Sequence, residues 1–198
     1  MLQFDLLGSN QAEIIQLKDA ELLYWPNLFD DLVFEELMEQ IQWQTETIRI
    51  AGIERVVPRL TAWYGDKGAD YYYSGVRHKP YAWSLQLLVI KEQLKQLIGH
   101  SFNSALCNLY RNGQDSVAWH SDDEPELGEN PLIASVSLGA TRRFELKHKT
   151  DKLKHKIDLT SGSLLVMQGT MQQHWLHQIP KEPAVQEPRI NITFRTII

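Results

Sequence analysis

The period of the hydrophobic pattern changes near residue 100, and this change constrains the fold more than any other feature. Over residues 132–138 apolar side chains alternate with their neighbours, and the alternation returns over residues 189–198. Residues 164–167 form a short apolar run after a Ser-Gly pair. A period of two is typical of β-strands. Many short strands without a helical pattern between them predict a β-sandwich or jelly roll for residues 101–198.

The first hundred residues show helical periodicity instead. Apolar residues recur at helical spacing over residues 31–42, where Asp30 is the expected N-cap, and over residues 83–98, which end at Gly99. We therefore expect an α+β protein that forms one compact unit. In it, residues 1–100 would be an N-terminal helical extension with a Tyr-, Trp- and Gly-rich link at residues 59–75, and residues 1–48 would cover the β core with helices.

The composition is that of a folded chain. Of the 198 residues, 43% are hydrophobic and 23% are charged, which argues against wholesale disorder. No apolar run approaches the roughly 18 residues of a membrane span, and the first residues do not resemble a signal peptide. Cys107 is the only cysteine, so no internal disulfide can form. These features predict a soluble, cytoplasmic protein, which we expect to be a monomer without a membrane partner.

Charge is distributed unevenly along the chain. The net charge is −5, but residues 1–48 hold ten acidic residues and one lysine, so the other 150 residues carry a net +4. Residues 142–156 hold seven basic residues and two acidic ones. Because a polyanion responds to local potential, this stretch is compatible with a nucleic-acid partner. A solvated hairpin tip, with lysines that only aid solubility, explains the same pattern.

His120 and Asp122 are two residues apart, which places both side chains on one side of an extended strand. The pair needs a third ligand, and either His174 or His177 could supply it. Two histidines and one carboxylate with open coordination positions form the facial triad of non-haem Fe(II) oxygenases. The same ligand types also suit a hydrolytic zinc site. The spacing therefore predicts a divalent-metal site and leaves iron and zinc open.

The last predicted strand is polar on one face and apolar on the other. By alternation, the polar face carries Arg189, Asn191, Thr193 and Arg195. Two arginines are costly to bury unpaired, so this face is expected to line a cavity for a dianionic ligand, unless it is a solvated edge strand. Asn108 and Tyr110, also two apart, would add polar contacts. Beside a facial triad, the pattern predicts a small dicarboxylate, for which 2-oxoglutarate is the obvious candidate.

Several motifs follow one another over residues 55–198. They are Asn108-x-Tyr110, His120-x-Asp122, Trp175-Leu176-His177 and the stretch from Pro188 to Arg195. In this order they resemble the AlkB family of Fe(II)- and 2-oxoglutarate-dependent dioxygenases, most of all the branch that repairs alkylated nucleic acid. The resemblance implies a double-stranded β-helix and makes His120, Asp122 and His177 the catalytic iron ligands. It assigns the 2-oxoglutarate contacts to Asn108, Tyr110, Arg189, Asn191, Thr193 and Arg195.

The resemblance also implies a reaction and a substrate. Relatives use O₂ to couple 2-oxoglutarate decarboxylation to succinate with demethylation of 1-methyladenine or 3-methylcytosine in DNA, and release formaldehyde. Such a base must be unpaired or flipped out and is then held by stacking. Implied substrate contacts, from a nucleotide-recognition lid and the loop after the iron ligands, are Arg59, Tyr71, Tyr73, Ser74, Asp123 and Glu124. Arg59 and residues 142–156 are candidates for phosphate contacts.

One stretch differs from relatives that act well on duplexes, which insert an aromatic wedge. Residues 50–53 contain no aromatic residue, which favours single-stranded substrates, although Ile50 or Ile53 could serve as a wedge. The pattern does not distinguish DNA from RNA. The alternatives are the same iron chemistry on RNA, a protein or a small molecule, and a non-catalytic jelly roll that binds nucleic acid.

Overall fold

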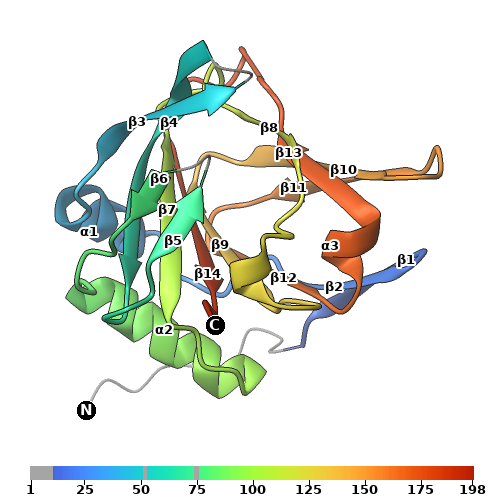
Figure 1. Ribbon diagram of the computed structural model, residues 1–198, viewed down its shortest axis with the longest axis horizontal. Helices are drawn as coiled ribbons and strands as arrows, with labels where there is room; N and C mark the ends of the chain where they lie inside the picture. Colours follow the sequence, from blue (N-terminus) through green and yellow to red (C-terminus); the bar gives the residue numbers. More distant parts are fainter. Residues whose placement is uncertain (1–10, 51–52, 74–75) are drawn as a thin grey trace.

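Two antiparallel β-sheets face each other in the computed structural model, which describes residues 11–50, 53–73 and 76–198 (Figure 1). The main sheet has the strand order β1-β2-β12-β9-β14-β7-β4-β3, and the minor sheet has the order β11-β10-β13-β8. The main-sheet strands are β1 (Glu13–Leu17), β2 (Ala20–Trp25), β3 (Gln44–Ile50), β4 (Ile53–Gly65), β7 (Ser104–Tyr110), β9 (Ile133–Gly139), β12 (Ser163–Gln168) and β14 (Arg189–Arg195). The minor-sheet strands are β8 (Val117–His120), β10 (Arg142–His148), β11 (Lys154–Leu159) and β13 (Trp175–Ile179). The two facing sheets confirm the predicted jelly-roll body.

The remaining elements are short except for one helix. They are α1 (Leu32–Gln40), α2 (Leu85–Ile98), α3 (Met171–His174), a 3₁₀ turn at Pro125–Leu127, and a hairpin of β5 (Tyr71–Tyr73) with β6 (Val76–His78). Both helices expected from the sequence are present. The N-cap of α1 is Asp31 and not the expected Asp30, although Asp30 Oδ1 accepts a hydrogen bond from the Leu32 backbone; Gly99 ends α2 as expected, with a φ of 76°. Among the described residues, no helix is long and apolar enough to cross a membrane.

β14 lies inside the main sheet, paired with β7 on one side and β9 on the other. Its apolar face, with Ile190, Ile192 and Phe194, joins the core formed with α1 and α2. Its polar face lines a cavity together with Phe144 and His177 of the minor sheet. The edge-strand alternative is thus wrong, because both edges of β14 are paired.

The expected helical cover from residues 1–48 is wrong for its first part. Residues 13–25 form the β1–β2 hairpin, and β2 pairs with β12 to extend the main sheet. Leu22 and Tyr24 are buried while Leu23 between them is partly exposed, which is the alternation of a strand with one covered face. Strands from both sides of residue 100 also pair, β4 with β7, so the helical extension and the core share one sheet.

Candidate active site

Three potential metal ligands meet where β8 and β13 pair. His120 lies opposite His177 in the register of the two strands, and their ring centroids are 4.2 Å apart. Asp122 follows in the loop after β8, and its Oδ1 lies 3.8 Å from His120 Nε2. One ligand atom from each residue lies within 4.8 Å of the other two. We call His120, Asp122 and His177 the inner cluster.

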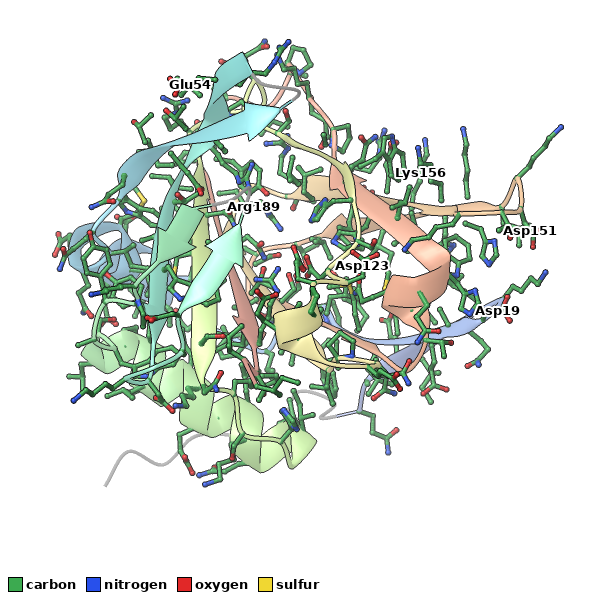
Figure 2. All side chains as sticks on the ribbon, viewed as in Figure 1. Asp19, Glu54, Asp123, Asp151, Lys156 and Arg189 are labelled. Atoms are coloured by element: carbon green, nitrogen blue, oxygen red, sulfur yellow. The ribbon has the colours of Figure 1, made fainter. Side chains whose placement is uncertain are left out.

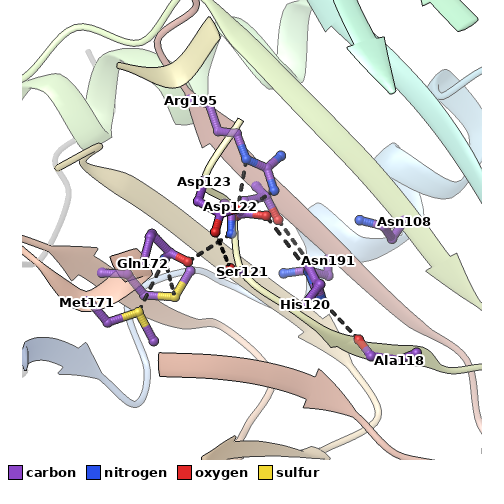
Figure 3. Close-up of polar contacts among 12 residues, drawn as sticks. Asn108, Ala118, His120, Ser121, Asp122, Asp123, Met171, Gln172, Asn191 and Arg195 are labelled. Atoms are coloured by element: carbon purple, nitrogen blue, oxygen red, sulfur yellow. Dashed lines mark hydrogen bonds and ion pairs between the residues drawn. The ribbon is translucent and has the colours of Figure 1, made fainter. Parts of the chain in front are cut away.

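Arg195 of β14 holds the carboxylate of Asp122. Its Nη2 lies 2.8 Å and its Nε 3.3 Å from Asp122 Oδ2 (Figure 3). Burial alone would raise the pKa of Asp122, but the charge of Arg195 and the neighbouring histidines bring that pKa well below its usual range. Asp122 is therefore an anion at neutral pH, as a metal ligand must be.

The two imidazoles are in a form that can bind a metal. Burial, with a further contribution from His120, lowers the pKa of His177 to about 3, so its ring is neutral at pH 7. His120 Nδ1 lies 2.8 Å from the Ala118 carbonyl oxygen. A carbonyl only accepts, so Nδ1 donates to it, and the neutral tautomer of this ring has its free lone pair on Nε2. Two imidazole nitrogens and one anionic oxygen suit Fe(II) or Zn(II).

Gln172 of α3 supports the loop that carries Asp122. Its Oε1 accepts a hydrogen bond from the Asp122 backbone at 2.9 Å, and the residue is 1% exposed (Figure 3). Its Nε2 contacts the sulfur atoms of Met167 and Met171. No sequence pattern indicates this contact, because it joins residues 50 positions apart.

A buried cavity of about 60 Å³ lies beside the inner cluster. Its walls include all six residues expected to bind 2-oxoglutarate: Asn108, Tyr110, Arg189, Asn191, Thr193 and Arg195. Arg189 is 1% exposed and donates to Ser137 Oγ at 2.9 Å, but its Nε and Nη1 have no hydrogen-bond partner among the described residues. Burial lowers its pKa to about 10, so it stays a cation at pH 7. A buried cation with two unused N–H groups is suited to an anionic ligand.

A larger cleft of about 450 Å³ also borders the inner cluster, through His120 and Asp122. Glu124 lines it, and Glu124 Oε2 is buried without a hydrogen-bond partner among the described residues. Trp63, which belongs to the Tyr-, Trp- and Gly-rich stretch, forms a further wall. Residues 44–47 of β3 and Tyr81 also line the cleft, and sequence patterns did not indicate them. The metal ligands therefore border both a small cavity and a cleft of ligand-binding size.

Residues 26–195 match the 2OG-Fe(II) oxygenase superfamily. The chain belongs to this superfamily. Its donors fit the cofactors of the superfamily, Fe(II) and 2-oxoglutarate: two imidazoles and one carboxylate for the metal, and the unpaired N–H groups of Arg189 for a carboxylate. The zinc alternative is thereby set aside for the inner cluster.

Similar proteins refine the relationship. The "Alpha-ketoglutarate-dependent dioxygenase alkB homolog 3" of Bos taurus is 48% identical over 177 residues, which cover 84% of this chain and 61% of that protein. The "DNA oxidative demethylase ALKBH2" of Mus musculus is 36% identical over 179 residues, which cover 85% of this chain and 75% of that protein. The resemblance to the AlkB family is confirmed, although the chain spans only 61% of the length of the first relative.

A solved structure supports the fold. The structure of OsALKBH1 superposes with a TM-score of 0.66 at 17% identity and covers 93% of this chain and 100% of that chain. The oxygenase fold expected from the sequence is therefore confirmed.

Two of the expected substrate contacts of this oxygenase are already bonded to other residues. Arg59 lines both the cleft and the cavity, is 8% exposed and donates to Asn108 Oδ1 at 2.6 Å, so its contact with the substrate stays a prediction. Asp123 is bonded to Ser121 Oγ at 2.8 Å and Lys149 Nζ at 3.1 Å and is not among the residues that line the cleft. Of the acidic pair after the ligands, only Glu124 lines the cleft.

Other expected contacts lie outside the part of the chain that the structure describes. The backbone of Tyr71 and Tyr73 forms β5, but their side chains lie outside the described residues, as does Ser74. The expected wedge side chains, Ile50 and Ile53, also lie outside them.

The basic stretch at residues 142–156 is partly structural. Arg142 is 1% exposed and bonds to Glu182 at 3.1 Å and to the backbone oxygens of Asp115 and Pro180. The prediction that Arg142 contacts phosphate is therefore wrong. Lys147 is partly exposed and lies over the Trp119 ring at 4.4 Å, whereas Arg143 on the same strand is exposed.

The two candidates for the third metal ligand separate clearly in the oxygenase. His177 belongs to the inner cluster, whereas His174 lies with Asp19 and His148 in a second group of potential ligands.

Proposed function

We propose that this oxygenase removes methyl groups oxidatively from N-alkylated bases of nucleic acid, such as 1-methyladenine and 3-methylcytosine. The observation that carries the proposal is that the inner cluster borders both the cavity lined by Arg189, here called the Arg189 cavity, and the cleft. A cofactor in the cavity and a base in the cleft would both reach the same metal. The names of the two AlkB relatives support this reaction.

In this proposal His120, Asp122 and His177 hold Fe(II). Arg189 pairs with the distal carboxylate of 2-oxoglutarate, and Asn108, Tyr110, Asn191, Thr193 and Arg195 complete its binding site. When bound, Fe(II), 2-oxoglutarate and O₂ supply the oxidising power for hydroxylation of the methyl carbon. The chain orients the polar side chains of the cavity: Asn191 Nδ2 donates to Ser135 Oγ at 2.8 Å, and Thr193 Oγ1 donates to Asn191 Oδ1 at 3.2 Å.

The substrate side favours a cationic base. The buried, unpartnered Oε2 of Glu124 faces the cleft two residues after Asp122. A carboxylate in such a place interacts favourably with the positive charge and N–H groups of 1-methyladenine or 3-methylcytosine. Tyr71, Tyr73 and Ser74 are proposed to contact the base, as in the family. A single-stranded DNA substrate is the finer proposal, and since every ligand of the site comes from one chain, we propose that a monomer suffices.

Mass spectrometry of a single-stranded DNA oligonucleotide with one 1-methyladenine tests this function. The protein is supplied with Fe(II), ascorbate and O₂, with and without 2-oxoglutarate. We expect the oligonucleotide to lose one methyl group only when 2-oxoglutarate is present, and we expect faster loss from the single strand than from the duplex. The same lesion in RNA measures the preference between the two nucleic acids.

The Asp122→Ala variant is the matched control for metal-dependent turnover. Succinate formation without demethylation of either nucleic acid would refute the proposed substrate and point to a protein or small molecule. Formation of neither product by wild-type protein loaded with iron would refute the oxygenase assignment of the inner cluster.

A further inference from the structure

A second group of potential metal ligands lies where the β1–β2 turn meets α3 and the end of β10. It consists of Asp19, His148 and His174, and one ligand atom from each lies within 4.8 Å of the other two. We call these residues the turn cluster. Figure 2 shows Asp19 and Asp151 at one end of the molecule, away from the interior position of Arg189. Neither the cavity nor the cleft of the proposed reaction is lined by this cluster.

We propose that the turn cluster is a second divalent-metal site, independent of the demethylation reaction. Two imidazoles and one carboxylate are donors that Zn²⁺ binds tightly, with a fourth position left for water. The ion would fasten the β1–β2 turn to α3 and to β10, three segments that are far apart in the sequence.

His148 is the central observation. Its side chain is 2% exposed, and its Nε2 is buried without a hydrogen-bond partner among the described residues. The nearest carboxylate oxygen, Asp19 Oδ2, lies 3.4 Å away. This is long for a hydrogen bond, whose usual range is about 2.7–3.2 Å. It is the separation of two ligand atoms that each lie about 2.1 Å from a tetrahedral zinc ion.

The three segments are already fixed by bonds that do not use the ligand atoms. Trp175 Nε1 donates to the Lys18 carbonyl at 2.8 Å, and Thr170 Oγ1 donates to the Asp19 carbonyl at 3.0 Å. The Lys149 backbone donates to the His174 carbonyl at 2.7 Å. The donors are therefore brought together before any ion binds, which lowers the ordering cost of binding.

The other nitrogen of His148 also has suitable neighbours. Nδ1 now accepts from the Asp151 backbone at 3.1 Å, so the proton of the neutral ring is on Nε2. When Nε2 binds a metal, this proton shifts to Nδ1. Thr150 Oγ1, at 3.2 Å, is then the acceptor for the new N–H group, and the Asp151 carboxylate lies nearby at 3.6 Å. A metal-bound histidine whose second nitrogen donates a hydrogen bond is a common arrangement.

Packing is the competing explanation of the same residues. The His148 and His174 rings are nearly parallel, with centroids 5.9 Å apart and an interplanar angle of 11°. His148 also meets the Trp175 ring edge-on at 5.2 Å. Packing explains the burial of the ring but leaves its Nε2 unsatisfied, and an unsatisfied buried nitrogen is unfavourable. A metal explains both.

Zinc stoichiometry distinguishes the two explanations. Protein stripped by a chelator is dialysed against Zn²⁺ alone, and bound metal is counted. We expect two equivalents on the wild type and one on a His120→Ala/Asp122→Ala double variant, which keeps the turn cluster only. One equivalent on the wild type with none on the double variant would overturn the proposal.

Further substitutions in the double variant locate the ion. Asp19→Asn removes a ligand but keeps a residue that tolerates the turn, where Asp19 has a φ of 56°. It should weaken Zn²⁺ binding about 100-fold or more, since even outer-shell partners of a metal are worth 10–100-fold. His174→Asn should do the same without disturbing the buried His148, and Asp158→Asn on β11 is the control. Unchanged affinity in both ligand variants would place the zinc elsewhere and refute the site.

Thermal unfolding gives a readout that does not depend on counting. An ion that binds only the folded state raises the unfolding temperature. We expect Zn²⁺ to raise it in the double variant and not after the added His174→Asn change. An equal rise in both would contradict the proposal.

Discussion

The inner cluster and the turn cluster offer the same three donor groups, and their third ligands, His177 and His174, are only three residues apart. Their surroundings differ. The side chain of Asp122 is 6% exposed and is bonded to Arg195, whereas that of Asp19 is 42% exposed. The inner cluster borders the Arg189 cavity and the cleft, and the turn cluster borders neither. The donors set which metals can bind, but reactivity depends on anion-binding arginines and on room for a substrate.

The largest expected difference comes from removing one carboxylate in each cluster. Asp122→Asn should lower demethylation and 2-oxoglutarate turnover by about 1,000-fold or more, since several kcal/mol of metal-dependent stabilisation are lost. Asp19→Asn, the same change at the turn cluster, should leave turnover within about twofold. The test measures the rates of demethylation and of 2-oxoglutarate turnover for both variants, together with the iron content of each protein. Comparable losses in the two would mean that the clusters are functionally one site.

Arg189 tests whether the cavity is what distinguishes the inner cluster. Arg189→Ala should raise the KM for 2-oxoglutarate about 100-fold, because a buried carboxylate loses its charged partner. The maximal rate at saturating 2-oxoglutarate should fall much less, because the metal ligands are untouched. Steady-state kinetics of this variant and of the control Arg143→Ala measures the change in KM. Arg143 lies on the minor sheet, 3.7 Å from Asp158. An unchanged KM would show that 2-oxoglutarate does not use Arg189.

The parts of the inner cluster that could be predicted from the sequence are those set by local alternation. His120 and Asp122 lie two residues apart, and the polar face of β14 follows the strand period, so short-range spacing located them. Gln172 and the β3 wall of the cleft could not be found in this way. Gln172 reaches the loop that carries Asp122, and β3 reaches the cleft, only because segments distant in the sequence pack or pair in the fold. Such contacts leave no local pattern in the sequence.

Errors at the turn cluster have the same origin. Residues 1–48 are expected to form a helical cover, yet the β1–β2 hairpin forms strands because β12 offers it an edge to pair with. Sequence spacing presents His174 only as an alternative third ligand for His120 and Asp122, or as a residue at the rim of that site. Its actual neighbours, Asp19 and His148, come from segments more than twenty residues away, and only the folded chain brings them together.

Gln172 lies between the clusters and should affect only one of them. Gln172→Leu removes the acceptor of the Asp122 N–H and should weaken metal binding at the inner cluster about 30-fold, within the range for outer-shell partners. Gln172→Glu keeps an acceptor and should restore most of the affinity. Co²⁺ titration followed by visible absorption reports the binding directly. If Gln172→Leu binds Co²⁺ as tightly as the wild type, the hydrogen bond does not position Asp122.

The smallest expected effect is that of Lys149→Met, which should change metal affinity in opposite directions at the two clusters. Lys149 Nζ bonds to Asp123 at 3.1 Å and to the Gln172 carbonyl at 2.8 Å, so it braces the ligand loop. Lys149→Met removes that brace, a partly exposed contact worth about 0.2–1 kcal/mol, and metal binding at the inner cluster should weaken about two- to threefold. At the turn cluster only a repelling charge beside His148 is lost, so Zn²⁺ binding should tighten slightly. Lys147→Met is the control. It removes a cation from the end of β10 that has no bond to α3, so metal binding at both clusters should strengthen or stay the same. If Lys149→Met changes metal affinity in the same direction at both clusters, Lys149 acts through its charge alone. Its bonds to Asp123 and Gln172 would then not stabilise the loop that carries Asp122.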